Sequence, residues 1–350
     1  MSRVWDVPVD DSTRVRDVRV ATEEASACAG LAPHRTAAAA LVATELATNL
    51  SRHADGGRVL INLVERGPDA GRRMSVQIVS MDHGPGIPDV AAAMRDGYTT
   101  TVASLGAGLG TCKRIANDFD LHSAPGRGTV AVARVDHDPV VRGVRPPFPR
   151  VGGVNVPLGR AGQSGDAWAR VCAGERLTLL LADGLGHGAK AADASMTAVR
   201  DLPGVAHLSP SEILRQLGTS LRPTRGAAVA VAQLDLGSGQ LHFAGIGNVG
   251  ARLRTGSTWR PLLSQPGIVG ARAPVSVPVQ HQPWHDDSLL VLHSDGLPAR
   301  WSPPDDAVLL GRDPGLVAAV VLRDAGSAAR PVGDDTCVVV LGGDPDGSRA

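Results

Sequence analysis

The spacing of apolar residues changes from helical to strand-like along the first part of the chain. The Ala-rich run Arg35–Ala54 carries apolar residues at helical spacing and is stopped by Gly56 and Gly57, so it predicts a helix. Strands are predicted over Arg58–Val64, Met74–Ser80 and Thr129–Val135, and helices over Val90–Arg95 and Leu109–Asp118. This order of elements predicts an α/β sandwich.

Short β-like runs dominate the rest of the chain. Strands are predicted over Ala167–Cys172, Leu177–Ala182, Ala227–Asp235, Gln240–Ile246, Ala251–Arg254, Ser288–His293 and Thr336–Leu341. Helices are predicted over Ala189–Arg200, Pro210–Leu221 and Pro314–Arg323. Many strands with a few helices are typical of an antiparallel β-sandwich flanked by helices, so the fold class of the whole chain is expected to be α+β.

A break in composition divides the chain. Residues 136–157 contain five prolines and three glycines without apolar periodicity, and this composition predicts an extended linker. A length of 350 residues also fits two domains at roughly 150 residues each. We therefore expect a first domain over residues 1–137, a linker over 138–150, a second domain over 151–342 and a polar tail over 343–350.

Charge and cysteine content exclude several classes of protein. The 35 basic and 35 acidic side chains cancel, so the chain lacks the basic surface on which nucleic-acid binding depends. The N-terminus has no apolar signal region, and the longest aliphatic run, Leu316–Leu322, is far shorter than the ~20 residues that span a bilayer. The four cysteines are dispersed and form no CxxC motif, which is typical of free thiols in a reducing cytoplasm.

A first set of chemical residues is ordered along the first domain. Glu45 and Asn49 lie four residues apart on one face of a predicted helix. The run Asp82-His-Gly84-Pro-Gly86 follows a strand, Gly106-Ala-Gly108-Leu109-Gly110 opens a helix, and Gly128-Thr129 opens the last strand. Each feature alone is more often a turn or a solvated charge, but the ordered set favours a nucleotide site.

The residue types in this set suit ATP and Mg²⁺. A carboxylate at a strand end can accept a hydrogen bond from the amine of adenine, and glycines let the backbone approach the nucleotide. A Gly-rich turn that opens a helix offers free N–H groups to phosphates. The amide oxygen of Asn49 suits Mg²⁺, and Glu45 beside it can act as a general base.

The ordered motifs resemble the ATP-binding boxes of the GHKL (Bergerat) superfamily, and the run from Asp82 to Thr129 resembles its RsbT-type serine kinases. The resemblance covers about residues 10–135. It implies that Glu45 is the catalytic base, Asn49 the Mg²⁺ ligand and Asp82 the adenine-binding residue. It also implies that residues 96–105 form a lid over the phosphates, and that the nucleotide is held by Gly84, Gly86, Gly106, Gly108, Leu109, Gly110, Gly128 and Thr129.

A second set of chemical residues is acidic. Asp166 enters a strand, while Asp183-Gly184 and Asp295 each follow an apolar strand, and Asp334-Asp335 precede the last one. An Asp-Gly pair alone is more often a hairpin turn. Several carboxylates at one end of a sandwich would repel one another unless cations lay between them, and oxygen ligands favour Mg²⁺ or Mn²⁺ over zinc.

This pattern, above all ADGLGHGAKAA, resembles the PPM-type serine/threonine phosphatases, in particular their SpoIIE and RsbX branch, over about residues 150–342. The resemblance implies two Mn²⁺ or Mg²⁺ ions. Asp183 would bridge both ions, and the other ligands would be the Gly184 carbonyl, Asp166, Asp295, Asp334 and Asp335. Asp335 is the weaker ligand candidate, because the family's ligand is normally the first acid of that pair.

Both resemblances together imply a bifunctional, cytoplasmic partner-switching enzyme that phosphorylates and dephosphorylates Ser or Thr. The expected substrate is a STAS-domain anti-sigma antagonist or a stressosome-type protein, with an anti-sigma factor or a downstream phosphatase as a further partner. A homodimer is compatible with either domain. Two alternatives stay open: a phosphatase regulated by a nucleotide-sensing or partner-binding first domain, and a scaffold that sequesters a regulator without catalysis.

Overall fold

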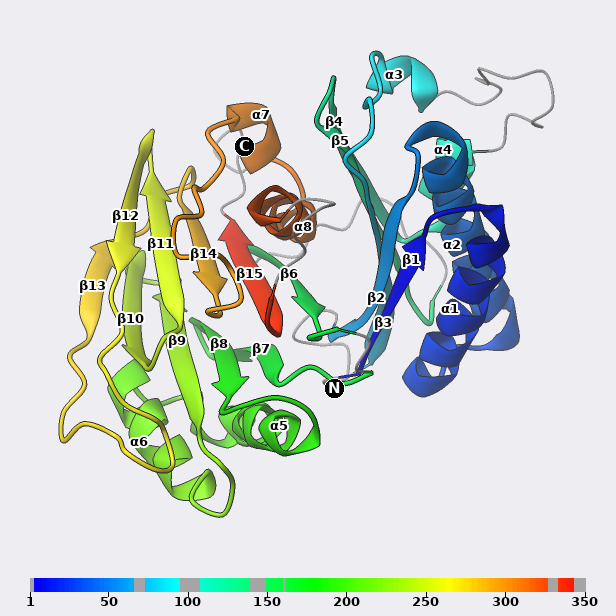
Figure 1. Ribbon diagram of the computed structural model, residues 1–350. Helices are drawn as coiled ribbons and strands as arrows, with labels where there is room; N and C mark the ends of the chain where they lie inside the picture. Colours follow the sequence, from blue (N-terminus) through cyan, green and yellow to red (C-terminus); the bar gives the residue numbers. More distant parts are fainter. Residues whose placement is uncertain are drawn as a thin grey trace. The chain divides into compact units, whose positions relative to one another are not determined.

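The computed structural model describes residues 3–65, 73–94, 108–138, 149–159, 162–326 and 333–342. The chain forms two compact units (Figure 1), one over Val4–Pro146 and one over Pro147–Gly326 with Arg330–Ala350. No helix in the described ranges is long and apolar enough to cross a membrane. Each unit has its own sheets and its own core.

The first unit is a single antiparallel sheet with helices on one face (Figure 1). The strands run in the order β1-β2-β3-β5-β4. The elements are β1 (Val4–Val9), a 3-10 turn (Ser12–Arg14), α1 (Val15–Ala29), α2 (Pro33–His53), β2 (Gly57–Glu65), β3 (Met74–Met81), α3 (Val90–Ala93), α4 (Gly108–Ile115), β4 (Asp118–Ala124) and β5 (Gly128–Val135). The expected α/β sandwich is confirmed for this unit.

The core of the first unit lies between the sheet and helices α1, α2 and α4. Alternate residues of β2, such as Val59 and Ile61, point into it, as the period of two along a strand requires. Helix α2 contributes Val42, Leu46 and Leu50 from one stripe. This packing fixes which face of α2 is left for chemistry.

Strands β1 and β4 and helix α1 of the first unit were not predicted, and the helix predicted over Leu109–Asp118 was too long. Strand β1 and helix α1 precede the first predicted element. Helix α1 has a polar sequence that packs mainly through small residues such as Ala21 and Ala25, so its apolar periodicity is weak. The helix predicted over Leu109–Asp118 ends at Ile115, because Asp118 starts β4 and pairs with Arg134.

The second unit is a sandwich of two five-stranded antiparallel sheets, in the orders β13-β10-β9-β8-β7 and β12-β11-β14-β15-β6. Its strands are β6 (Arg150–Val156), β7 (Asp166–Ala173), β8 (Arg176–Gly184), β9 (Ala227–Asp235), β10 (Gln240–Ile246), β11 (Gly250–Thr255), β12 (Thr258–Leu262), β13 (Gln280–Pro283), β14 (Leu289–His293) and β15 (Thr336–Gly342). Its helices are α5 (Ala189–Val205), α6 (Pro210–Ser220), α7 (Ala307–Leu310) and α8 (Pro314–Ala325).

The main core of this unit lies between the two sheets and includes Leu179, Phe243 and Val339. Helices α5 and α6 cover the outer face of the first sheet over a second core that contains Leu180 and Val231. Helix α8 packs on β6 and β15 of the other sheet (Figure 1). The expected helix-flanked β-sandwich is confirmed, and with it the α+β class of the chain.

The predicted linker is corrected at its C-terminal end. Residues 150–156 form β6, which pairs with β15 over its whole length. The two glycines that made this stretch resemble a linker are packing sites. A β-carbon on Gly152 would lie 2.2 Å from the amide nitrogen of Gly315 in α8, and one on Gly153 would lie 2.9 Å from the ring of Trp168. Glycine is used here for close approach rather than for flexibility.

Candidate functional sites

Helix α2 carries Glu45 and Asn49, the two helical residues of the candidate nucleotide site. It starts with Pro33 in its first turn, after the extended residue Ala32, and this is a favoured way to begin a helix. Glu45 and Asn49 are half-buried one turn apart, while Leu46 and Leu50 beside them are fully packed. The hydrophobic stripe of α2 therefore orients the catalytic-base and Mg²⁺-ligand candidates away from the core.

Asp82 organises the loop that follows β3. Its side chain is buried, and Oδ1 accepts hydrogen bonds from the amides of Gly84 at 2.8 Å and Thr129 at 3.1 Å. The backbone amide of Asp82 in turn donates to the Thr129 carbonyl at 3.0 Å. The structure thus brings the adenine-binding candidate together with the start of β5, from which the sequence analysis chose Gly128 and Thr129.

The glycines of this loop are required by close backbone approaches. Gly128 has a φ of +79°, and a β-carbon there would lie 2.2 Å from the carbonyl oxygen of Asp82. A β-carbon on Gly84 would meet Ala54 at the end of α2 at 2.8 Å, and one on Gly86 would meet the Ala124 carbonyl at 2.4 Å. Larger residues would push these segments apart and open the Asp82 loop.

Helix α4 begins at Gly108 and stands against α2. Leu109 and Cys112 pack into the core, and burial followed by the negative charge of Glu45 raises the pKa of the Cys112 thiol to about 12. The Cys112 thiol lies 3.9 Å from the Val42 carbonyl oxygen, so α4 lies beside α2 within one turn of Glu45. Gly108 and Gly110 are thus at the N-terminal end of α4, where free N–H groups favour anions, whereas Gly106 and the lid over residues 96–105 lie outside the described residues.

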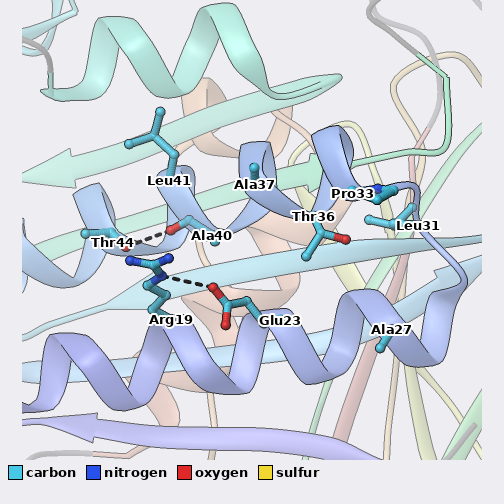
Figure 2. Close-up of a pocket in the computed structure, with 10 residues that line it drawn as sticks. All are labelled: Arg19, Glu23, Ala27, Leu31, Pro33, Thr36, Ala37, Ala40, Leu41 and Thr44. Atoms are coloured by element: carbon cyan, nitrogen blue, oxygen red, sulfur yellow. Dashed lines mark hydrogen bonds and ion pairs between the residues drawn. The ribbon is translucent and has the colours of Figure 1, made fainter.

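In the described part of the chain, grooves also lie outside the predicted sites. One of about 680 Å³ lies between α1 and α2 (Figure 2), where Arg19 and Glu23 form an ion pair at 2.9 Å. The other, of about 610 Å³, lies between α6 and the segment around Val275. Neither groove is lined by a residue that the sequence analysis selected.

The acidic residues of the second unit meet at one edge of the sandwich. Strand β7 begins at Asp166 opposite Asp183, where β8 ends. In the facing sheet, β14 ends at His293, which pairs with Val338 in the first half of β15. Antiparallel pairing therefore brings the two strand ends of each sheet to this edge, and Asn155 joins the sheets by donating to the Asp166 carbonyl at 2.8 Å.

Asp166 is the most enclosed of these carboxylates. It is 0% exposed, and neither carboxylate oxygen has a hydrogen-bond partner among the residues that the structure describes. Burial and the charge of Asp183 raise its pKa well above the usual range, although the nearby Ser294 hydroxyl favours the charged form. A buried carboxylate without a partner is costly, and a cation beside it would remove that cost.

The neighbouring carboxylates are perturbed in the same direction. Burial, then the charges of Asp295 and Asp334, raise the pKa of Asp183 to about 7. Burial and the charge of Asp334 also raise the pKa of Asp295. These shifts show that the acids lie within electrostatic reach of one another and that their charges are not balanced inside the site.

The two adjacent acids Asp334 and Asp335 differ in their surroundings. Asp335 is buried. Its two carboxylate oxygens accept hydrogen bonds from the backbone amides of Leu158 at 2.7 Å and Gly165 at 2.9 Å. Asp334 is exposed, and its Oδ1 accepts a hydrogen bond from the backbone amide of Asp335 at 2.8 Å. Asp335 thus holds the segment before Asp166 in place, while the charge of Asp334 acts on Asp183 and Asp295.

Two polar residues at this site were missed by the sequence analysis as functional candidates. The amide nitrogen of Asn248 donates a short hydrogen bond to Asp295 Oδ2, which favours the charged carboxylate. The hydroxyl of Ser294 accepts a hydrogen bond from the backbone amide of Cys337 at 2.9 Å, which links the residue after β14 to β15. Asn248 lies in a Gly-rich turn 47 residues before Asp295, so only the folded register reveals the pairing.

The donor set at this edge suits a hard divalent cation. It consists of carboxylate oxygens and the backbone carbonyl of Gly184, which is buried at the end of β8. Position 184 requires a glycine, because a β-carbon there would lie 2.0 Å from the Ala191 carbonyl oxygen. Within the ranges that the structure describes, no three His, Cys, Asp or Glu side chains are grouped closely enough to form a complete ligand set. The unpartnered oxygens of Asp166 and the raised pKa values of its neighbours nevertheless fit such a cation.

Comparison with known proteins gives matches to both units. The histidine kinase-like ATPase domain matches residues 9–134, and stage II sporulation protein E (SpoIIE) matches residues 173–342. The serine/threonine-protein kinase RsbT of Bacillus subtilis (strain 168) is 41% identical over 86 residues, which are 25% of this chain. The match covers 61% of the length of RsbT, less than two thirds of it.

Solved structures give two further likenesses. A chain of the bacterial stressosome, described as a modular system adapted to control secondary messenger signalling, is 26% identical with a TM-score of 0.49. It covers 55% of this chain and 97% of its own length. The PP2C phosphatase domain of SpoIIE from Bacillus subtilis, with a fragment of its regulatory domain, is 15% identical with a TM-score of 0.47, over 80% of this chain and 81% of that one.

Proposed function

Because this chain joins a GHKL ATP-binding domain of the RsbT type to a SpoIIE-type domain of the PPM phosphatase family, we propose that it both adds phosphate to Ser or Thr of a partner protein and removes it. The first domain uses ATP and Mg²⁺, and the second uses two Mn²⁺ or Mg²⁺ ions. The substrate is a STAS-domain protein of the anti-sigma antagonist or stressosome type. The similarity to RsbT, a serine/threonine-protein kinase, supports the first activity.

In the phosphatase half, Asp166, Asp183, Asp295 and Asp334 hold the ions together with the Gly184 carbonyl. Bound divalent ions supply an activated water and offset negative charge on the phosphoryl group. The chain itself orients these ligands: Asn248 fixes Asp295, Asn155 anchors the backbone of Asp166, and Asp335 holds the segment before it. Metal ligands of this kind bind in the charged form, and the raised pKa values of Asp166, Asp183 and Asp295 would make metal binding weaken as pH falls.

In the kinase half, Asp82 binds the adenine amine and Asn49 binds Mg²⁺ at the phosphates. Glu45 takes the proton of the attacking hydroxyl as general base. The hydrogen bonds from Gly84 and Thr129 to one oxygen of Asp82 support its part of this assignment, because they hold the carboxylate in a fixed direction. The position of α4 beside Glu45 supports placing the phosphates near that end of α2.

The single observation that carries the phosphatase assignment is the fully buried, unpartnered carboxylate of Asp166 opposite Asp183. Hydrolysis of a phosphoserine protein with Mn²⁺ tests it. Wild-type chain should release phosphate, and Asp183→Asn should reduce the rate to background. Full phosphatase activity in the Asp183→Asn variant would contradict the phosphatase assignment.

A further inference from the structure

Strand pairing places Arg225 beside the loop that follows Asp183. In the register of β8 and β9, Asp183 pairs with Ala228 and Gly184 pairs with Ala227. Arg225 stands two residues before β9, so it lies opposite the first residues after β8. The amide of Leu185 donates to the Gly226 carbonyl at 3.0 Å and closes the gap between the two segments.

The guanidinium of Arg225 lies over this loop. Gly186 has a φ of +88°, and a β-carbon on it would lie only 2.9 Å from Arg225 Nη1. The planar group thus rests against the backbone three residues after Asp183. A side chain at position 186 would displace it, so the glycine leaves room for the arginine as well as for the turn.

The turn that carries Arg225 is held by its own hydrogen bonds. The Thr224 hydroxyl donates to the Leu221 carbonyl at 2.8 Å and accepts the Gly226 amide at 3.0 Å. Ala227 exchanges two backbone hydrogen bonds with Val269, at 2.9 and 3.1 Å. The backbone of Arg225 is therefore fixed, while its side chain is exposed.

Arg225 forms no ion pair with any residue in the described ranges, although the loop against which it rests begins two residues after Asp183. A phosphate monoester that approaches this acidic edge meets repulsion wherever cations do not offset it. A guanidinium presents paired N–H donors that match two phosphoryl oxygens. An exposed arginine at the rim is well suited to receive that dianion.

We propose that Arg225 binds the phosphoryl group of the substrate at the rim of the carboxylate site. The proposal rests on the phosphatase function proposed above and names a residue that binds its substrate. The arginine would donate to two phosphoryl oxygens and so hold the ester group at the carboxylate site. It takes no proton and forms no covalent bond.

The test compares Arg225→Ala and Arg225→Lys with the control Arg222→Ala. Arg222 is exposed three residues earlier in the same turn, but its side chain lines the groove beside α6. The measurements are kcat and KM for a phosphoserine protein with Mn²⁺, the inhibition constant of inorganic phosphate, and phosphate binding by calorimetry. The Mn²⁺ concentration for half-maximal activity and the unfolding temperature control for damage to the site.

Loss of a charged hydrogen-bond donor should raise KM and the phosphate inhibition constant of Arg225→Ala about ten- to a hundredfold. Arg225→Lys should lie between this variant and wild type, and Arg222→Ala should match wild type. The Mn²⁺ requirement and unfolding temperature should not change. Unchanged phosphate binding in Arg225→Ala overturns the inference, whereas an inactive wild-type chain overturns the phosphatase function itself.

Discussion

Asp166 and Asp183 are register partners where β7 begins and β8 ends, and the carboxylate of Asp166 has no hydrogen-bond partner within the described part of the chain. Burial and the charge of Asp183 raise the pKa of Asp166, and burial with the charges of Asp295 and Asp334 raises the pKa of Asp183. The fold therefore sets two acids against each other at a cost that cations would offset. This arrangement has consequences for stability as well as for catalysis.

Removing one of the two charges should stabilise the metal-free protein. Asp166→Asn and Asp183→Asn keep the shape of the side chain but remove the repulsion, so each should raise the unfolding temperature by about 2–4 °C for each kcal/mol relieved. Both variants should also lose the stabilisation that Mn²⁺ gives to wild type. Thermal unfolding with and without Mn²⁺ measures both effects. The control Asp193→Asn, an exposed acid on α5, should behave as wild type, and a lower unfolding temperature for both site variants would contradict this account.

The stability of the metal-free protein should fall as pH rises from about 4 to 7. The pKa of Asp183 is raised from 3.8 to about 7, so across this range the folded state keeps a proton that the unfolded state has lost. The contribution is complete below the unfolded pKa and gone above the folded one. Urea unfolding of wild type and Asp183→Asn at pH 5 and pH 8 isolates it. The variant should show the smaller change, and equal changes would show that Asp183 does not titrate as described.

Asn248 should set the affinity of the site for metal ions. Asn248→Ala removes the amide that favours the charged form of Asp295 and orients its carboxylate. Loss of such a positioning contact typically weakens metal binding about 10–100-fold. The Mn²⁺ concentration for half-maximal activity should rise accordingly, with no fall in unfolding temperature because Asn248 is exposed. An unchanged Mn²⁺ requirement would assign Asn248 to the turn alone.

Substitution of the two adjacent acids before β15, Asp334 and Asp335, should have different effects on stability and on Mn²⁺ binding. Asp335→Asn places an amide against two backbone donors in a buried position, which should cost about 1–3 kcal/mol of stability. Asp334→Asn should leave stability within about 0.5 kcal/mol, because the residue is exposed, but should weaken Mn²⁺ binding. Denaturant unfolding and Mn²⁺ titration of both variants give the comparison. The opposite pattern would make Asp335 the ligand and Asp334 the structural residue.

Two glycines of the first domain offer a matched test of the Asp82 loop. Gly126 and Gly128 both have positive φ, at +72° and +79°, so alanine strains the backbone at each. Only at Gly128 would the new β-carbon meet the Asp82 carbonyl, since nothing lies within 4 Å at Gly126. Gly128→Ala should therefore weaken ATP binding by at least about tenfold more than Gly126→Ala. Calorimetric titration with ATP decides, and equal losses would show that backbone strain alone is responsible.

The sequence predicted what depends on local order. The apolar run of β8 ending in Asp183-Gly184, and the Ala-rich helix with Glu45 and Asn49, are visible as periodic segments with polar residues at defined positions. Both domain types followed from these motifs in order. Strand β13 was missed because its sequence, Gln-His-Gln-Pro, has few strand-forming residues and is held by pairing with β10.

What the sequence did not show depends on register. The contact of Asn248 with Asp295 spans 47 residues, and that of Asp335 with Leu158 spans 177. The two glycines of β6 were taken for linker because the helix that packs on Gly152 comes more than 150 residues later. Long-range packing of this kind overrides local propensity, so glycine and asparagine positions were the least readable.

One chain that both adds and removes the same phosphate should transfer label from ATP to its partner and strip it again. We would incubate Asp183→Asn chain, which cannot remove phosphate on this account, with γ-labelled ATP, Mg²⁺ and a STAS-domain protein. Label should appear on the partner, disappear when Glu45→Ala is combined with Asp183→Asn, and be stripped when wild-type chain and Mn²⁺ are added. ATP binding without any transfer of label would contradict the claim and leave a phosphatase with a nucleotide-sensing domain.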